Sequence, residues 1–341
     1  MLHFDSDYME GAHPEVMRRL CETNLEQTVG YGCDEYTRVA KTKIKEAIGL
    51  PDAEVHFLVG GTQTNATVID GLLRPHQGVL AAETGHINVH ESGAIEATGH
   101  KVLTLPQHMG KVKAEEVEAY INDFYRDETY EHMVAPGMLY ISHPTEYGTL
   151  YSLAELEALS NVCRRAEIPL YMDGARLGYA LASPATDVTL KDVARLCDVF
   201  YIGGTKVGAL FGEAVVATRP GLLTHFFPLI KQHGALLAKG RLLGVQFDTL
   251  FTDNLYVEIA SHAIRHAMKL KQAFVSKGYR LHMDSYTNQQ FICMPNEQID
   301  RLMQHATFEL WGPRGEHETV VRFVTSWATT DEAINQLIEQ L

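Results

Sequence analysis

A lysine, an aspartate and a glycine-rich turn each follow a short apolar run in this chain. The run VFYI leads through GGT to Lys206, PLYM leads to Asp173, and VHFLV leads to GGTQTN (60–65). A lysine desolvated in such a place has a lowered pKa and can act as a nucleophilic amine. A buried carboxylate needs a cationic partner, because an unpaired buried charge is costly. The ordinary alternatives are a lysine that reaches solvent along its apolar stem and an ion pair between Asp173 and Arg176.

The turn GGTQTN precedes the helical stretch ATVIDGLL, which places its backbone N–H groups at a helix N-terminus. Such a terminus presents free donors and a positive dipole end, and it binds phosphate well. Thr62 and Thr64 add hydroxyl groups. The turn matches neither G-x-G-x-x-G nor a Walker loop, so dinucleotide and nucleoside triphosphate binding are not supported. A simple N-cap turn is the alternative.

Together the three stretches match the needs of pyridoxal 5'-phosphate. Its phosphate favours a helix N-terminus, its pyridine nitrogen an anion, and its aldehyde a lysine amine. Adjacent strands lie about 4.8 Å apart. Asp173 and Lys206 at neighbouring strand ends are therefore expected to flank one ring.

Seven apolar runs are typical of the covered strands of a parallel sheet. They span residues 55–60, 78–83, 101–106, 137–142, 169–174, 199–204 and 214–219. An amphipathic helical stretch, 153–167, lies between two of them. This alternation predicts an α/β fold, a mostly parallel seven-stranded sheet with helices on both faces. Ligands bind outside the carboxyl ends of such strands, where the polar residues above lie.

The pattern changes near residue 248. Residues 254–278 form one long helical stretch that ends at Gly278, as helices often do. Shorter strand and helix patterns follow. We therefore predict a large cofactor-binding domain with an N-terminal arm over 1–248 and a small C-terminal α+β domain over 249–341.

Composition excludes several classes of protein. The formal net charge of -14 argues against a nucleic-acid binder, which needs a basic face. The five cysteines form no C-x-x-C pair, so we expect a reducing compartment without a disulfide framework. No run approaches 18 apolar residues and the N-terminus has no signal-peptide pattern, which favours a cytoplasmic enzyme that does not contact a membrane.

The chain resembles the threonine aldolase and β-eliminating lyase family of fold-type-I pyridoxal-phosphate enzymes. The most specific motifs are DGARLG, GGTK, ETGHINVHESGA and VRFVTS, and the resemblance runs from DSDYMEG near the start to VRFVTSW near the end. It implies pyridoxal 5'-phosphate as the cofactor. It also implies a homodimer or homotetramer with the active site at the subunit interface.

The resemblance assigns roles to individual residues. For the cofactor, Lys206 forms the internal aldimine, Asp173 binds the pyridine nitrogen and His86 stacks on the ring; Gly61, Thr62 and Gln63 hold the phosphate, and Arg176 belongs to the same site. For the substrate carboxylate, the implied groups are Ser6, Arg176 and Arg322, since an arginine fork pairs bidentately with carboxylate. For a cation that the neighbouring subunit sends to the phosphate, the candidates are Lys231, Lys239 and Arg241.

One stretch departs from the family pattern. Threonine aldolases of this family usually carry N-T-H-N before a glycine, where this chain reads SHPTEYGTL (142–150). Alignment on Gly148 places Glu146 where the histidine stands, and His143 lies three residues earlier. The catalytic base is therefore open between His86, Glu146 and His143. The spacing of His86 with His90, and of His262 with His266, is compatible with metal on a helix, but no third ligand is evident and we expect no metal.

The expected reaction is retro-aldol cleavage of a β-hydroxy-α-amino acid of the threonine or allo-threonine type to glycine and an aldehyde, as in low-specificity threonine aldolases. The first alternative is β-elimination from another amino acid, because the motifs at the strand ends serve both reactions. The second is a non-catalytic regulatory protein that retains the fold.

Overall fold

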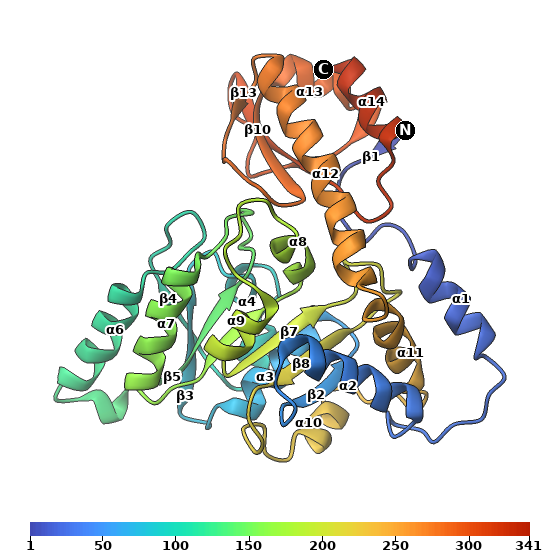
Figure 1. The fold of residues 1–341 in the computed structure, drawn as a ribbon. Helices are drawn as coiled ribbons and strands as arrows, with labels where there is room; N and C mark the ends of the chain where they lie inside the picture. Colours follow the sequence, from blue (N-terminus) through green and yellow to red (C-terminus); the bar gives the residue numbers. More distant parts are fainter.

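The computed structural model describes residues 1–341, and a seven-stranded sheet forms its larger part (Figure 1). The strand order is β2-β8-β7-β6-β5-β3-β4, and only β8 runs against its neighbours. The strands are β2 (Glu54–Leu58), β3 (Gln77–Ala82), β4 (Val102–Leu105), β5 (Ala135–Ser142), β6 (Leu170–Asp173), β7 (Val199–Gly203) and β8 (Glu213–Ala217). All seven predicted runs are strands of this sheet, so the predicted fold class is confirmed.

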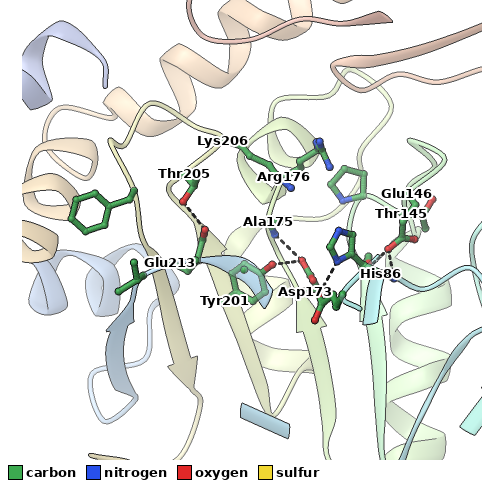
Figure 2. Close-up of a pocket in the computed structure, with 17 residues that line it drawn as sticks. His86, Thr145, Glu146, Asp173, Ala175, Arg176, Tyr201, Thr205, Lys206 and Glu213 are labelled. Atoms are coloured by element: carbon green, nitrogen blue, oxygen red, sulfur yellow. Dashed lines mark hydrogen bonds and ion pairs between the residues drawn. The ribbon is translucent and has the colours of Figure 1, made fainter. Parts of the chain in front are cut away.

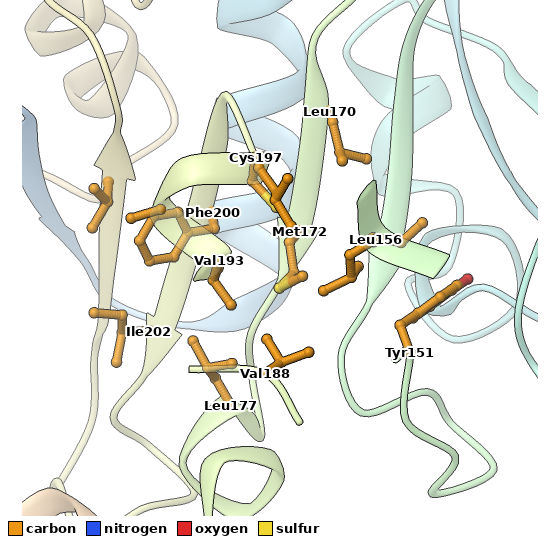
Figure 3. Close-up of a cluster of buried hydrophobic side chains, with 14 of the residues drawn as sticks. Tyr151, Leu156, Leu170, Met172, Leu177, Val188, Val193, Cys197, Phe200 and Ile202 are labelled. Atoms are coloured by element: carbon orange, nitrogen blue, oxygen red, sulfur yellow. The ribbon is translucent and has the colours of Figure 1, made fainter. Parts of the chain in front are cut away.

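Helices cover both faces of the large sheet, because each strand presents apolar side chains on both sides. On β7, Phe200 and Ile202 join one hydrophobic core and Val199 and Tyr201 join the other; Figure 3 shows part of the first core. The helices of the first core are α1 (Pro14–Glu22), α2 (Glu35–Ile48), α6 (Ala114–Arg126), α7 (Leu153–Arg165), α8 (Leu177–Leu181), α9 (Leu190–Leu196) and α11 (Arg241–Leu250). Those of the second core are α3 (Gly61–Leu72), α4 (His86–Val89), α5 (Ala94–Ala97) and α10 (Phe226–Gln232). A single 3-10 turn, η1 (Tyr130–His132), precedes β5.

The C-terminal part is a smaller α+β unit beside the large sheet (Figure 1). Its antiparallel sheet has the order β12-β13-β10-β9. Its elements are β9 (Arg280–Leu281), β10 (Gln289–Pro295), α13 (Asn296–Leu302), β11 (Ala306–Thr307), β12 (Glu309–Leu310), β13 (Glu318–Val324) and α14 (Asp331–Gln340). The chain start belongs with this unit, since β1 (Leu2–His3) pairs with β11 and Phe4 lies in its core.

Helix α12 (Leu255–Ser276) connects the two parts (Figure 1). Ile259 packs into the first core of the large sheet, whereas Phe274 packs into the core of the small one. The predicted division after residue 248 falls within α11 and stays a prediction. None of the helices combines the length and the apolar character that a membrane-spanning segment needs.

Local signals set where the helices begin and end. At the start of α7, the Ser152 hydroxyl accepts a hydrogen bond from the Glu155 N–H, and the Glu155 side chain accepts one from the Ser152 N–H, which is a capping box. Helix α2 ends at Gly49 with a φ of 73°, a left-handed conformation that glycine adopts without strain. Helix α3 differs, because Gly60 precedes it and no side chain caps it.

Candidate active site

The carboxyl ends of β5, β6 and β7 and the turn after β2 surround one polar cavity (Figure 2). Residues from well-separated parts of the sequence meet there because these strands are neighbours in the sheet. Of the residues predicted for the site, those that line the cavity are Gly61, His86, Glu146, Asp173, Arg176 and Lys206.

Asp173 is the last residue of β6, is only 5% exposed, and accepts hydrogen bonds at both oxygens of its carboxylate. One oxygen accepts hydrogen bonds from the Tyr201 hydroxyl at 2.6 Å and the Ala175 N–H at 3.0 Å. The other accepts from the Tyr140 hydroxyl at 2.7 Å and the Asn65 amide at 3.0 Å. Four donors stabilise the ionised form, so the site contains a fixed negative charge.

His86 lies beside this carboxylate and is tied to a second buried acid. Its Nδ1 lies 2.7 Å from Glu91 Oε1, which also accepts a hydrogen bond from Asn65 at 2.7 Å. Burial disfavours charge on both His86 and Asp173. The hydrogen bond to Glu91 and the charge of Asp173 nevertheless raise the pKa of His86. The charge of His86 and the hydrogen bond from Tyr201 lower the pKa of Asp173.

The first turn of α3 faces the cavity with unpaired backbone donors. The first intrahelical hydrogen bond runs from the Thr64 N–H to the Gly60 carbonyl oxygen, so the N–H groups before it have no partner within the helix. The Gln63 side chain is engaged elsewhere, because its amide donates to the His233 carbonyl oxygen at 2.8 Å. Thr62 is exposed at this turn. The backbone of the turn, more than its side chains, is available to an anion.

The loops that carry Asp173 and Lys206 pack backbone against backbone. The Gly203 N–H donates to the Gly174 carbonyl oxygen at 2.9 Å. A Cβ on Gly203 would stand 2.2 Å from the Ala175 carbonyl oxygen, so no side chain fits there. This close approach explains why residue 203 is a glycine, and it brings the loops after Asp173 and before Lys206 together.

The Lys206 amine is partly buried among charged groups (Figure 2). Its nitrogen lies 5.9 Å from the centroid of the Tyr8 ring. Burial and the positive charge of Arg176 lower its pKa, against the opposing charges of Asp7 and Asp173. A lowered pKa increases the fraction of neutral, nucleophilic amine.

Arg176 is held by a buried carboxylate that the sequence analysis did not identify. Its Nε and Nη2 donate to the two oxygens of Asp7 at 2.7 and 2.9 Å. Asp7 is fully buried and also accepts from Asn288 at 2.9 Å. Ser6, the predicted substrate ligand, directly precedes Asp7 and is partly buried outside the cavity lining.

Arg322 on β13 has both engaged and free donors. Its Nη1 donates to Gln289 at 2.8 Å, and the guanidinium also pairs with Glu309. Its Nε is buried without a partner. Burial and the charge of Arg176 lower the pKa of Arg322. Arg176 lines the cavity, whereas Arg322 does not.

The two candidate bases in the SHPTEYGTL stretch, Glu146 and His143, lie in different environments. Glu146 lines the cavity, and its Oε1 accepts from the His86 N–H at 2.9 Å and the Ser142 hydroxyl at 2.7 Å. Burial and the charge of Asp173 raise the pKa of Glu146.

His143 does not line the cavity. It is fully buried, and its Nδ1 accepts a hydrogen bond from the Tyr151 N–H at 3.4 Å. Burial and the charge of Lys111 lower its pKa to about 4. The structure therefore separates His143 from the other candidates and leaves it as a neutral residue of the interior.

The three basic candidates lie in α10, in the turn before α11 and at the start of α11, and their side chains differ in whether they are engaged. Lys231 and Lys239 are exposed, whereas Arg241 donates to the carbonyl oxygens of Glu26 and Thr23. No group of three or more histidine, cysteine, aspartate or glutamate side chains is arranged to hold a metal ion.

Sequence reasoning missed the groups that hold the charged residues, namely Asp7, Asn65, Glu91, Tyr140 and Tyr201. The sequence did indicate two of them, because Tyr140 and Tyr201 place hydroxyl groups within buried strands, near the carboxyl ends of those strands. A buried tyrosine hydroxyl needs a partner, and Asp173 between them was the candidate. Asp7 and Glu91 had no comparable signal, because their partners are distant in sequence or lie across a turn.

Comparisons with known proteins give the family and the fold. The family model described as β-eliminating lyase matches residues 3–297. The low-specificity L-threonine aldolases of Pseudomonas aeruginosa and Pseudomonas sp. (strain NCIMB 10558) are each 29% identical to this chain, covering 99% and 98% of it and 96% and 95% of their own lengths. The solved threonine aldolase of Leishmania major is 42% identical and superimposes with a TM-score of 0.96, covering 99% of this chain and 98% of that one. An aspartate aminotransferase of Thermus thermophilus, 15% identical, shares the fold with a TM-score of 0.72 over 100% of this chain and 90% of that one.

Proposed function

The chain belongs to the β-eliminating lyase family, and on this basis we propose that it is a pyridoxal-phosphate-dependent aldolase that cleaves threonine-type β-hydroxy-α-amino acids to glycine and an aldehyde. The main support for the proposal is that two residues line the same cavity: Asp173, which is ionised and held by four donors, and Lys206, whose pKa is lowered by burial. The names of the full-length relatives support the aldol reaction over β-elimination.

The residues present fit the cofactor. The unpaired N–H groups of the first turn of α3 suit its phosphate, the Asp173 carboxylate suits a protonated pyridine nitrogen, and the Lys206 amine suits its aldehyde. When bound, the cofactor supplies an electron sink for the pair released from the substrate's Cα–Cβ bond.

Arg176 and Arg322 hold the substrate carboxylate in this proposal, with Ser6 beside them. Asp7 occupies Nε and Nη2 of Arg176, which leaves its Nη1 to the substrate. The buried, unpartnered Nε of Arg322 gains an acceptor when a carboxylate binds. Two such contacts fix the direction of the Cα–Cβ bond, an orientation effect of several kcal/mol (roughly 7 or more in well-oriented reactions).

Glu146 takes the proton of the β-hydroxyl group in this proposal. Its carboxylate lines the cavity, and Ser142 and the His86 N–H fix one of its oxygens. A raised pKa makes Glu146 a stronger base than an exposed carboxylate and brings it closer to a neutral operating pH. The ring of His86 has its Nδ1 tied to Glu91, which suits a fixed face against the cofactor ring.

The assembly proposed is a homodimer or homotetramer with the site at the subunit interface. In this assembly the loop between α1 and α2, where Leu25 is 92% exposed and Val29 68% exposed, is a candidate contact segment. Light scattering of the purified protein measures the oligomeric state.

Spectroscopy of Lys206→Ala tests the cofactor assignment. The wild-type protein is expected to take up the cofactor and absorb near the visible edge, whereas the variant shows only the spectrum of the free cofactor. Lys277→Ala, which changes an exposed lysine after α12, is the control and keeps the wild-type spectrum. An unchanged spectrum in Lys206→Ala would reject Lys206 as the attachment point.

A further inference from the structure

Asn65 lies behind the cavity and contacts two of the carboxyl groups that line it. It belongs to α3, one turn after the Gly61 backbone proposed for the phosphate, and only 1% of it is exposed. Its amide nitrogen donates to Asp173 Oδ2 at 3.0 Å and to Glu91 Oε1 at 2.7 Å. Asp173 and Glu91 line the cavity, whereas Asn65 does not. The Asn65 amide therefore acts on a ligand of this cavity through these two carboxyl groups.

The neighbours of the Asn65 amide fix the direction in which it points. Both partners of its nitrogen are carboxylate oxygens, which accept hydrogen bonds, and an amide NH₂ group has two protons to donate. On the other side, the Tyr171 hydroxyl donates to Asn65 Oδ1 at 2.8 Å. Tyr171 is fully buried within β6, so these hydrogen bonds form in the protein interior. A flipped amide would place its oxygen against the two carboxylates and lose both hydrogen bonds to them.

The two carboxyl groups depend on Asn65 to different degrees. Asp173 also accepts hydrogen bonds from three other donors. Glu91 Oε1 has only Asn65 and His86 Nδ1 as partners, each at 2.7 Å, and Glu91 Oε2 is buried without a partner. Asn65 is therefore the one group that holds the Glu91 carboxyl independently of His86. Through Glu91 it sets the ring of His86, which stands beside Asp173 (Figure 2).

We propose that Asn65 is a positioning residue that joins three contacts of the cofactor in one rigid unit: the phosphate turn of α3, the carboxylate for the pyridine nitrogen and the ring of His86. A buried network whose hydrogen bonds are connected holds its members in one arrangement. This inference rests on the proposed function, because it concerns the residues that hold the cofactor there. It predicts that the loss of Asn65 weakens cofactor binding through Glu91 as well as through Asp173.

The cofactor affinity of two matched variants tests this inference. Tyr140→Phe and Asn65→Leu each remove one donor from Asp173 Oδ2, but only Asn65→Leu also releases Glu91. Equilibrium dialysis of the holoenzyme against graded cofactor concentrations measures the Kd. We expect Tyr140→Phe to raise the Kd about tenfold and Asn65→Leu about 100-fold, since each lost hydrogen bond to a charged group weakens binding by roughly tenfold or more. The visible circular dichroism of the bound cofactor should decrease in Asn65→Leu, because the ring of His86 is no longer fixed, and persist in Tyr140→Phe.

Combined variants show whether Asn65 acts through Glu91. Asn65→Leu combined with Glu91→Gln should lose less cofactor affinity than the product of the two single losses, because both changes break the same link. Tyr140→Phe combined with Glu91→Gln should lose the full product, because Tyr140 and Glu91 share no hydrogen bond. Thermal unfolding is followed in parallel, since a purely structural role of Asn65 would lower the unfolding midpoint and leave the Kd of the folded protein unchanged.

Two results would overturn the inference and leave the proposed function standing: equal Kd values for Asn65→Leu and Tyr140→Phe, or fully multiplied losses when Asn65→Leu is combined with Glu91→Gln. If Asn65→Leu does not fold, Asn65→Ser takes its place in the same comparisons, because a single hydroxyl proton serves at most one of the two carboxyl groups. A wild-type protein that takes up no cofactor would overturn both the inference and the proposed function.

Discussion

The aspartate side of the site consists of Asp173 and its four donors, and the arginine side consists of Arg176, which lines the cavity, and Arg322, which does not. The two sides differ in how many of their polar groups have partners. On the aspartate side, all four donors to Asp173 lie within 3.0 Å. On the arginine side, Arg322 Nε is buried without a partner, and its other donors pair with Gln289 and with Glu309 near the surface. Both sides hold buried charges, yet only one of them is complete within this chain.

The difference indicates which part of the site is organised in advance. A charge fixed by four donors needs no rearrangement at the moment of reaction, which is the condition for strong electrostatic catalysis. A guanidinium with a free buried donor gains a hydrogen bond when an anion arrives. Changes on the aspartate side should therefore affect turnover, and changes on the arginine side should affect substrate binding.

Asp173→Asn is expected to produce the largest effect. It keeps the side-chain shape but removes the charge, and kcat should fall by roughly 10²–10³-fold, the loss typical of a preorganised electrostatic group. Tyr201→Phe removes one of the four donors and keeps the charge, so the expected loss is about tenfold. Steady-state kinetics measure both. Equal losses in the two variants would show that the charge has no special role.

Glu146→Gln is expected to lower kcat by about 10²-fold, because a general base contributes at least that much. The base acts when ionised, and burial raises its pKa, so wild-type turnover should fall as the pH drops through that raised value. The variant should lose this acid limb. A pH profile of kcat for both proteins is the measurement, and an acid limb that persists in Glu146→Gln assigns it to another group.

Arg322→Lys tests the arginine side. A lysine cannot provide the bidentate fork, so KM should rise about tenfold with kcat nearly unchanged, the pattern of a lost ground-state contact. Glu309→Gln is the matched control, because it releases Arg322 from its partner near the surface and leaves the guanidinium in place. A fall in kcat equal to the rise in KM would place Arg322 with the aspartate side instead.

His143→Asn is expected to change turnover least, by less than about twofold, since His143 lies outside the cavity. It should change the pH dependence of stability. The folded-state pKa of about 4 lies below the usual value of 6.5, so the folded protein binds fewer protons and loses stability as the pH falls from about 6.5 to 4. Denaturant unfolding at pH 7 and pH 5 should show a smaller loss in the variant. A large loss of turnover at pH 7 would return His143 to the list of candidate bases.

The strands of the large sheet were predictable from the sequence, because buried strands appear as apolar runs. The positions of the reactive residues were predictable too, because ligands of such sheets bind at the carboxyl ends of the strands. Lys206 and Asp173 stood out since charge is rare at such positions. The network around them was not predictable, because it depends on side chains brought together by the sheet. Asn65 on α3 reaches both Glu91 and Asp173, and no spacing in the chain connects those residues.

Two candidate bases that are close in the sequence lie in different parts of the structure. Glu146 and His143 are three residues apart, yet one faces the cavity and the other contacts Tyr151 in the interior. The direction of a side chain in a loop depends on the path of the backbone, which the motif alone does not specify. In the same way, Asp7 pairs with Arg176 across 169 positions.

Product analysis with threonine distinguishes aldol cleavage from β-elimination. The purified holoenzyme is incubated with L-threonine and L-allo-threonine, and glycine, acetaldehyde, 2-oxobutyrate and ammonia are quantified, with Lys206→Ala as the blank. Aldol cleavage yields glycine and acetaldehyde in equal amounts, and this result is expected with at least one of the two substrates. Formation of 2-oxobutyrate and ammonia without glycine would contradict it and assign the site to β-elimination.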